Sequence, residues 1–517
     1  MIFSRPILTT LVSAFASVIL PHLAQAQEPS AADAAMTSRI EAMSPQIDAY
    51  ATRGMEAYDV PGLAIGIIVG DSLVYAKGFG VRSKSGGQPV DTRTVFQIGS
   101  NTKAFLAASI AIMVDRGKLK WDDRIVDLYP DFQMKDPWVT REFRVFDLLA
   151  QRSGLPSLVN DMLAMLGFDE RALIRSLRDV DPISSFRTTF AYTNITHLLA
   201  SRIVADAAGA RGWSDVLQRN LLDPLGMKDS TWTVEAIEGA ANHANGHRWT
   251  LEGTVEVPFT PIFPYHFAGA GNINSNIEDM ARWVRLQLAH GAFDGHEIVS
   301  PENLAVTRMA RVALSDRLSY AMGWYNYDTA NGTIVWHDGD ALSFGSFVGL
   351  VPARNVGVII LTNESNVGFP SALGTWILDR VMGNPEVDYV ATRITETKAY
   401  FAAAAARFAP PPNPRPFPPL NPLAGAFVSP SFGKASVVVE GNALVMEILA
   451  TGAKLKLEPW DGDIFVARLM PIGQFGPVVA LDYMTKGFVQ FQIAPDGKLD
   501  VLTMTLADGQ RYAFQRE

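Results

Sequence analysis

A run rich in proline near residue 410 constrains the fold of this chain more than any other feature. Eight prolines lie between Pro410 and Pro422. Because proline has a fixed φ and no backbone N–H, neither a helix nor a central strand continues through such a run, which instead acts as a stiff spacer. We therefore predict two domains, residues 31–400 and 423–517, joined by a linker over residues 408–422.

The first 26 residues have the pattern of a signal peptide. Arg5 precedes a largely apolar run over residues 7–20, and Ala24 and Ala26 place small side chains where a signal peptidase cleaves. We predict cleavage after Ala26 and a periplasmic or secreted mature protein that does not contact a membrane. A retained membrane anchor is the alternative, although the run is short for a bilayer span.

The chain contains no cysteine, which excludes disulfides, a thiol nucleophile and thiolate metal ligands. Any nucleophile must therefore be an oxygen or a nitrogen. The formal net charge of -9, without long runs of lysine or arginine, argues against nucleic acid as a partner. The same charge argues against an anionic membrane as a main partner.

The first predicted domain has strands at both ends and helices between them. Apolar runs rich in β-branched residues predict strands over residues 62–69, 72–78, 345–352 and 356–361. Helical patterns cover residues 31–57, 104–116, 172–177, 195–208, 277–290 and 372–382. We predict an α/β class, in which both ends of the domain build one sheet, covered on each face, with a helical insertion.

Beyond the proline-rich run, the pattern changes to short strands separated by turns. Residues 435–446 indicate two strands joined by a Gly-Asn turn. Further turns are expected at Gly452, Asp461-Gly462, Gly487 and Asp496-Gly497. We predict a small antiparallel barrel of about eight strands.

Ser100 and Lys103 are the first candidate catalytic pair. Their i, i+3 spacing at the start of the helix predicted over residues 104–116 places both side chains on one face. The helix N-terminus favours negative charge there, which suits a serine nucleophile and a developing oxyanion. Taken alone, a serine helix cap beside a solvated lysine explains the same residues.

Tyr192 and Asn194 form the second candidate motif, just before the helix predicted over residues 195–208. A phenol near cationic or hydrogen-bonding groups can act as a general base. The Asn194 side chain has both a donor and an acceptor, so it can hold Lys103 and a substrate amide together. The alternative is a core tyrosine beside an asparagine cap.

His337, Gly339 and Asp340 form the third candidate motif, before the strand predicted over residues 345–352. Gly339 would let a substrate backbone approach the strand edge. We expect His337 to donate to a substrate carboxylate or to the Tyr192 oxygen, and the Asp340 N–H to form an oxyanion hole with the Ser100 N–H. The alternative is a histidine in an ordinary turn.

The order of these motifs resembles that of the penicillin-recognising serine hydrolases, which include class C β-lactamases, DD-peptidases, esterases and D-aminopeptidases. Those proteins carry Ser-x-x-Lys, Tyr-x-Asn and Lys/His-x-Gly in this order. Further segments are similar to the family at residues 96–100, 117–123, 147–149, 153–155 and 223–227. The likeness extends over residues 40–382.

The resemblance implies an α/β/α sandwich with an antiparallel sheet and an all-helical lobe, and a site where the two meet. It implies acylation of Ser100, with Lys103 and Tyr192 sharing the proton transfers, followed by hydrolysis. Which of these two is the base stays open. We predict no cofactor and no metal. His243 and His247 have the spacing of a helical metal pair, but their surroundings indicate a loop or strand.

Two departures from the family pattern bear on the substrate. The third motif has His337 where classical β-lactamases usually carry lysine, which argues against a dedicated penicillinase. The predicted barrel resembles the lipocalin-like domains of some peptidases in this family, where they narrow the cleft or build oligomers. We predict a peptidase or amidase that acts on short or D-residue-containing peptides, with a carboxylesterase, a β-lactamase or a non-catalytic binding module as alternatives; a homo-oligomer stays open.

Overall fold

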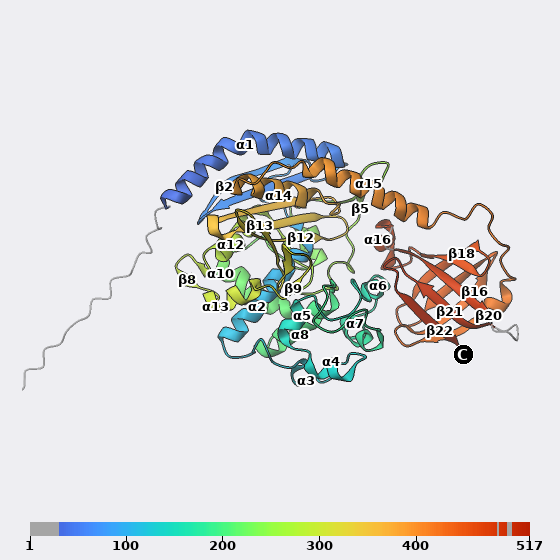
Figure 1. Ribbon diagram of the computed structural model, residues 1–517. Helices are drawn as coiled ribbons and strands as arrows, with labels where there is room; N and C mark the ends of the chain where they lie inside the picture. The colour runs from blue at the N-terminus through green and yellow to red at the C-terminus, as the bar shows by residue number, and fades with distance from the viewer. Residues whose placement is uncertain (1–29, 483–484, 494–498) are drawn as a thin grey trace, which may run out of the picture.

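The computed structural model describes residues 30–482, 485–493 and 499–517 of the chain (Figure 1). The predicted signal peptide and the turn predicted at Asp496-Gly497 lie outside the described residues. Within those ranges, no helix combines the length and the apolar character needed to cross a bilayer.

Eight antiparallel strands form the main sheet, in the order β2-β1-β14-β13-β12-β11-β10-β9. This confirms the predicted α/β class and the assembly of one sheet from both ends of the domain. The strands are β1 (Gly62–Val69), β2 (Ser72–Gly80), β9 (Val312–Ala313), β10 (Leu318–Tyr320), β11 (Tyr325–Thr329), β12 (Gly332–Asp340), β13 (Gly345–Val351) and β14 (Val356–Thr362). One detail differs from the prediction: β2 is an edge strand and is partly exposed, because only β1 pairs with it.

Helices cover both faces of this sheet. The helices α1 (Ala31–Tyr58) and α14 (Phe369–Met382) pack together on one face, and α12 (Ile277–Leu288) packs on the other (Figure 1). Glycines on the strands allow the close approach of α12. A Cβ on Gly66 would lie 2.7 Å from Ile277, and one on Gly357 would lie 2.3 Å from Val284.

A helical lobe lies beyond α12, built around α2 (Thr102–Asp115) and α8 (Ile195–Ala208), which contact each other. Twelve of the 14 residues of α2 are buried, so this helix runs through the core. The other helices are α3 (Ile125–Leu128), α4 (Pro137–Glu142), α5 (Val145–Leu149), α6 (Asp161–Met165), α7 (Glu170–Ser176), α9 (Trp213–Leu217), α10 (Asp223–Leu225), α11 (Val234–Gly239) and α13 (Pro301–Arg308). Short strand pairs join β3 (Phe96–Gln97) to β6 (Asn274–Ser275), β4 (Gly246–Arg248) to β5 (Val255–Val257), and β7 (Ala292–Phe293) to β8 (His296–Glu297).

The C-terminal part is a closed antiparallel barrel of eight strands, as predicted. Pairing of the first strand with the last, at Phe427 with Arg516 and Val428 with Gln515, closes it. Its strands are β15 (Gly425–Ser429), β16 (Gly433–Glu440), β17 (Ala443–Ile448), β18 (Ala453–Asp461), β19 (Ile464–Leu469), β20 (Lys486–Ile493), β21 (Leu499–Thr505) and β22 (Arg511–Arg516), with the short helix α16 (Phe475–Ala480) between β19 and β20.

A helix that the sequence analysis did not predict, α15 (Tyr389–Arg407), extends from the sheet towards the barrel (Figure 1). The barrel also contacts the helical lobe directly. The Tyr512 hydroxyl donates to Asn160 Oδ1 at 2.8 Å, and the rings of Phe168 and Phe432 stand 5.5 Å apart. These contacts place the barrel against α6 and α7.

Candidate active site

Ser100 lies in a single 3₁₀ turn, Gly99–Asn101, that leads directly into α2. Gly99 has φ +50, a conformation that favours glycine, and a Cβ there would lie 2.7 Å from the Asp340 backbone nitrogen. The same turn approaches β12 at a second point, where a Cβ on Gly339 would lie 2.0 Å from the Ile98 carbonyl oxygen. Two glycines thus allow the turn that carries Ser100 to pack backbone-to-backbone on β12.

Lys103 is fully buried one helical turn beyond Ser100. Its ammonium nitrogen donates to Ser100 Oγ at 3.0 Å, to Asn194 Oδ1 at 2.8 Å and to the Ala270 carbonyl oxygen at 2.9 Å. Burial lowers the pKa of Lys103 to about 7, against the opposing effect of the Asp161 carboxylate. A substantial fraction of neutral amine is therefore present beside Ser100 at neutral pH.

Tyr192 completes the group of residues around Ser100. Lys103 Nζ stands 4.7 Å from the centre of the Tyr192 ring. The Tyr192 hydroxyl is buried and makes no hydrogen bond of ordinary geometry with any residue that the structure describes. Burial raises the pKa of Tyr192 well above its usual value, although the neighbouring Ser100 hydroxyl opposes this rise. The structure thus brings Ser100, Lys103, Tyr192 and Asn194 together.

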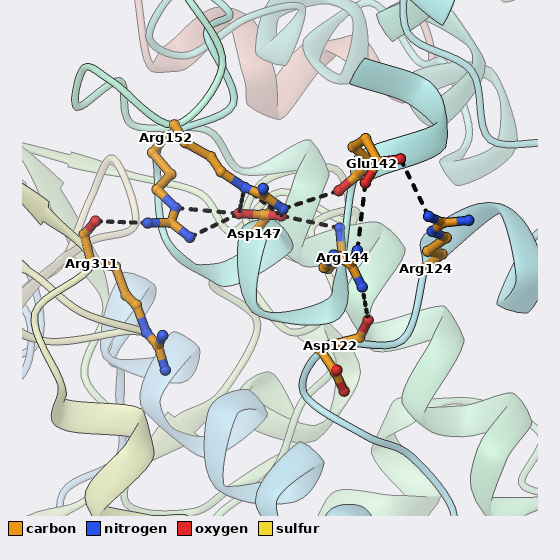
Figure 2. A network of polar contacts seen from close by, with 8 residues as sticks. Asp122, Arg124, Glu142, Arg144, Asp147, Arg152 and Arg311 are labelled. Carbon is orange, nitrogen blue, oxygen red and sulfur yellow. Dashed lines mark hydrogen bonds and ion pairs between the residues drawn. The ribbon is translucent and has the colours of Figure 1, made fainter. Parts of the chain in front are cut away.

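An ionic cluster surrounds the buried Asp147 carboxylate (Figure 2). The fully buried Asp147 carboxylate accepts from Arg152 Nη2 at 3.0 Å and from Arg187 Nη2 at 2.6 Å. These arginines belong to two segments that pair by backbone hydrogen bonds, from Arg187 N to Arg152 O and from Ala191 N to Gln151 O. Asp147 therefore fixes the segment that leads to Tyr192.

The residues of the third predicted motif lie in two environments, His337 in the protein interior and Asp340 at the cavity. His337 is buried, its Nε2 lies 3.2 Å from the Tyr320 hydroxyl, and its Nδ1 contacts the Asp338 carbonyl oxygen. Burial lowers the pKa of His337 to about 3, so the ring is neutral. Asp340, in contrast, lines the cavity beside Ser100. Because β11 pairs only with Gly332–Trp336, the edge of His337–Asp340 on that side has no strand partner among the described residues.

Asp161, which the sequence analysis missed, extends this site. Asn194 Nδ2 donates to Asp161 Oδ2 at 2.6 Å, so hydrogen bonds connect Ser100, Lys103, Asn194 and Asp161 in a row. Burial raises the pKa of Asp161 to about 7, while Asn194 and Lys103 oppose the rise. No spacing signal marked this residue, because it follows a turn at Asn160 and begins a helix of only five residues.

A cavity of about 1130 Å³ opens above Ser100. Its walls come from the helical lobe, from β12, from α15 and from the barrel. The apolar part includes Met162, Phe263, Phe267 and Leu342, whereas the barrel contributes polar residues such as Arg468, Lys486 and Asp508. A cavity of this size accommodates a short peptide or a compound of drug size.

The two histidines with metal-like spacing do not share a helix. His247 lies on β4, where its Nδ1 stands 2.7 Å from the Asn363 carbonyl oxygen. Among the residues that the structure describes, no group of three or more acidic or histidine side chains is arranged to hold a metal ion.

Comparison with known proteins extends over both parts of the chain. Residues 47–381 match the family model Beta-lactamase, and residues 409–516 match a model described as Domain of unknown function (DUF3471). The chain is 26% identical over 478 residues to the unguisins hydrolase ungD of Aspergillus violaceofuscus, covering 81% of this chain and 82% of that protein. It is 28% identical over 383 residues to penicillin-binding protein 4 of Amycolatopsis lactamdurans, covering 72% and 93%.

A solved structure shares the fold. The octameric penicillin-binding protein homologue from Pyrococcus abyssi superimposes with a TM-score of 0.59 at 21% identity, over 91% of this chain and 100% of that one. The family model alone spans well over half of the sequence and includes Ser100, Lys103, Tyr192 and His337. The chain therefore belongs to the Beta-lactamase family.

Proposed function

We propose that this protein is an exported serine hydrolase that forms an acyl-enzyme on Ser100 and acts as a peptidase or amidase on short or D-residue-containing peptides. The observation that carries the proposal is the 3.0 Å hydrogen bond between Lys103 Nζ and Ser100 Oγ. The relatives named as an unguisins hydrolase and as a penicillin-binding protein support a hydrolase.

We assign the role of general base to Lys103 rather than to Tyr192. The Lys103 pKa of about 7 leaves a neutral amine in contact with the Ser100 hydroxyl, whereas the pKa of Tyr192 is raised well above its usual value. A general base works best when its pKa lies near the working pH. In acylation, neutral Lys103 accepts the Ser100 proton as Oγ attacks the carbonyl carbon. The Tyr192 hydroxyl donates its proton to the leaving nitrogen and is reprotonated by Lys103, and attack of water on the acyl-enzyme then releases the acid and restores the Ser100 hydroxyl.

The developing oxyanion needs two donors. We assign the backbone N–H groups of Ser100 and Asp340 to this role, since the packing of Gly99 on Asp340 brings these two backbone segments together. The unpaired edge of His337–Asp340 suits an extended substrate, which would add to β12 as a strand. His337 itself is buried with partners on both ring nitrogens, so we assign it a structural role beneath this edge rather than a grip on a substrate carboxylate.

Covalent labelling tests the proposal. A fluorophosphonate probe should label the wild type at Ser100, and Ser100→Ala should abolish the labelling. Ser109→Ala is a matched control, because Ser109 is buried on the same helix and its hydroxyl bonds only to the Phe105 carbonyl oxygen and weakly to Trp213. Labelling that survives in Ser100→Ala would refute the assignment of the nucleophile.

A substrate panel then separates the classes of activity. We expect D- and L-peptides to be cleaved with a higher kcat/KM than p-nitrophenyl esters, corrected for the intrinsic reactivity of the ester, and nitrocefin to be a poor substrate. Activity on esters alone would replace the peptidase assignment by a carboxylesterase, and rapid turnover of nitrocefin would replace it by a β-lactamase.

A further inference from the structure

A smaller pocket of about 350 Å³ adjoins the cavity above Ser100 at the end of β12. The pocket and the cavity share six lining residues, from the β4–β5 hairpin, the end of β12 and α15: Arg248, Trp249, Asp340, Leu342, Tyr400 and Phe401. The helix α15 lies between residues 47–381 and residues 409–516, so neither matching family model includes its contribution. This pocket is therefore a candidate subsite built partly by the connecting helix of this chain.

Large apolar side chains from three elements line the region where the cavity meets the pocket. Tyr400 on α15 is 63% exposed, and Leu251 in the turn of the β4–β5 hairpin is 47% exposed. The Trp249 and Phe401 rings pack edge-to-face with their centres 4.9 Å apart. Together with Leu342 at the end of β12, these four side chains form what we call the apolar wall. Exposed apolar side chains that gather in a cavity are typical of a binding surface.

The backbone at Leu342 has an unusual conformation. Its φ is +64, a value that a side chain of this size rarely adopts. The Leu342 N–H donates to Asp340 Oδ1 at 2.7 Å, and the Ala341 N–H donates to the Phe344 carbonyl oxygen at 3.0 Å. Strained backbone of this kind persists where the surrounding structure holds it, and it is concentrated at ligand sites. The turn after β12 thus holds Leu342 where the cavity and the pocket meet.

Most polar side chains of the pocket already have partners in the protein. Asn366 Nδ2 donates to the Gly339 carbonyl oxygen at 3.1 Å, and Thr397 Oγ1 donates to a backbone carbonyl oxygen at 2.7 Å. Arg248 Nε donates to a carbonyl oxygen of α16 at 3.2 Å, and Glu396 is exposed to solvent. A polar group that entered the pocket would have to compete for these partners. The pocket therefore suits an apolar group.

The proposed chemistry determines which part of the substrate reaches this pocket. Tyr192 serves the leaving nitrogen, and its ring lies 6.2 Å from the His337 ring. The leaving group therefore lies towards the His337 end of the unpaired edge of β12, and the scissile carbonyl lies at the Asp340 N–H. A substrate extended along this edge carries its acyl part onwards to Leu342. Two residues of extended chain span about 7 Å, so the group that reaches the apolar wall precedes the residue whose carbonyl is attacked.

We propose that the apolar wall binds an aromatic or other large apolar group in the acyl part of the substrate, directly before the residue that acylates Ser100. The enzyme would then select peptides in which an apolar side chain or an apolar acyl cap occupies that position. This inference rests on the proposed acyl-enzyme chemistry and adds the group that the same site selects.

Matched substrates test the selectivity. The ratio of kcat/KM for 3-phenylpropionyl-alanine p-nitroanilide to that for acetyl-alanine p-nitroanilide isolates the acyl group, measured with the alanine enantiomer that is cleaved faster. Burial of a phenyl ring should make this ratio about ten to a hundred in the wild type. The succinyl analogue carries a carboxylate in place of the ring and should be no better than the acetyl substrate. A ratio near one, or a preference for the succinyl analogue, would overturn the inference.

Variants of the apolar wall locate the effect. Tyr400→Ala removes a largely exposed ring and should lower the ratio about three- to tenfold, whereas Tyr400→Phe should keep it within about twofold. Leu251→Ala should lower the ratio in the same direction. Phe417→Ala is a matched control, because Phe417 is 51% exposed and lies outside the lining of both the cavity and the pocket. Equal effects of Tyr400→Ala and Phe417→Ala would overturn the inference.

A binding measurement keeps this inference separate from the proposed chemistry. In calorimetry, the Ser100→Ala variant should bind 3-phenylpropionyl-alanine amide more tightly than acetyl-alanine amide, and the additional change Tyr400→Ala should reduce that difference. Equal binding of the two amides would overturn the inference. Tighter binding of the phenylpropionyl compound without turnover of either p-nitroanilide by the wild type would instead refute the acyl-enzyme proposal and leave the apolar subsite supported.

Discussion

The pH dependence of acylation gives the sharpest test of the site. A lysine with an ordinary pKa of about 10.4 is ~0.04% neutral at pH 7, whereas a pKa of about 7 leaves half of it neutral. Burial of Lys103 thus increases the amount of base about a thousandfold. For a substrate that does not titrate, we expect log(kcat/KM) to rise with pH up to about 7 and then to level off, with about a tenth of the plateau rate at pH 6.

The rising limb of this pH profile, below pH 7, has a second candidate besides Lys103. The pKa of Asp161 is also about 7, and its charge is coupled to that of Lys103. The variant Asp161→Asn separates the two, since an asparagine retains an acceptor for the Asn194 amide. The Asp161 carboxylate raises the pKa of Lys103, so its removal should lower that pKa. The limb should therefore move to lower pH, and the fraction of plateau activity at pH 6 should increase.

The other titratable groups near the site should not produce a rising limb near pH 7. Burial lowers the pKa values of His197 and His337, so neither histidine titrates near neutrality. The pKa of Asp340 is raised to about 6 by burial, but Asp340→Asn should leave the limb where it is.

The assay is the kcat/KM of a neutral N-acylated p-nitroanilide between pH 5 and 10, with Lys103→Met as the inactive control. A wild-type limb near pH 10 would refute the lowered pKa of Lys103. Disappearance of the limb in Asp161→Asn would assign it to Asp161, and a shift to higher pH would contradict the coupling.

Three further changes test the framework around the site. Asp147→Ala would leave the partly buried guanidinium groups of Arg152 and Arg187 without their carboxylate, so the free energy of unfolding in urea should fall by about 1–3 kcal/mol; an unchanged midpoint would show that the cluster is dispensable. Gly339→Ala would push a methyl group onto the Ile98 carbonyl oxygen, and the resulting displacement of the nucleophile turn should lower kcat/KM about a hundredfold. Tyr512→Phe would leave Asn160 Oδ1 unpaired at the barrel contact and should cost about 0.5–1.5 kcal/mol in the same denaturation assay, a loss that a loosely docked barrel would not show.

The elements that the sequence predicted well share strong local signals. The strands Gly62–Val69 and Gly345–Val351 are continuous apolar runs bounded by turn residues, and both are fully buried. The helix Ile195–Ala208 ends where it was predicted to end, because Gly209 adopts the left-handed conformation that stops it. The eight-stranded barrel was predictable from its turns at Gly452 and Asp461-Gly462. The turn expected at Gly487 was wrong, because Gly487 lies within β20 and pairs with Ala467.

The elements that were missed lack such signals. The helix Tyr389–Arg407 has a single buried residue, Val390, and its other core contacts, at Ile394 and Phe401, are only partly buried, so its apolar stripe is sparse. The strands Val312–Ala313 and Leu318–Tyr320 are too short to show a period. In the site, the order of the motifs predicted Ser100, Lys103, Tyr192 and Asn194. We expected His337 to face the substrate, but it lies beneath the cavity. Asp161 is recognisable only in the folded chain, where its carboxyl is buried and its Oδ1 has no hydrogen-bond partner among the described residues. No spacing in the sequence marks these properties.

Both domains contribute residues to the wall of the cavity, and this bears on how proteins of this architecture diverge. Ser100 and Tyr192 line the cavity from the first domain, whereas Asp508, Arg468 and Lys486 reach the same space from the barrel. Evolution can therefore alter what the enzyme accepts by exchanging the barrel or its β21–β22 turn, without disturbing the chemistry at the serine. We therefore expect a chimera that carries a relative's barrel to accept a changed range of substrates while Ser100, Lys103 and Tyr192 stay in place.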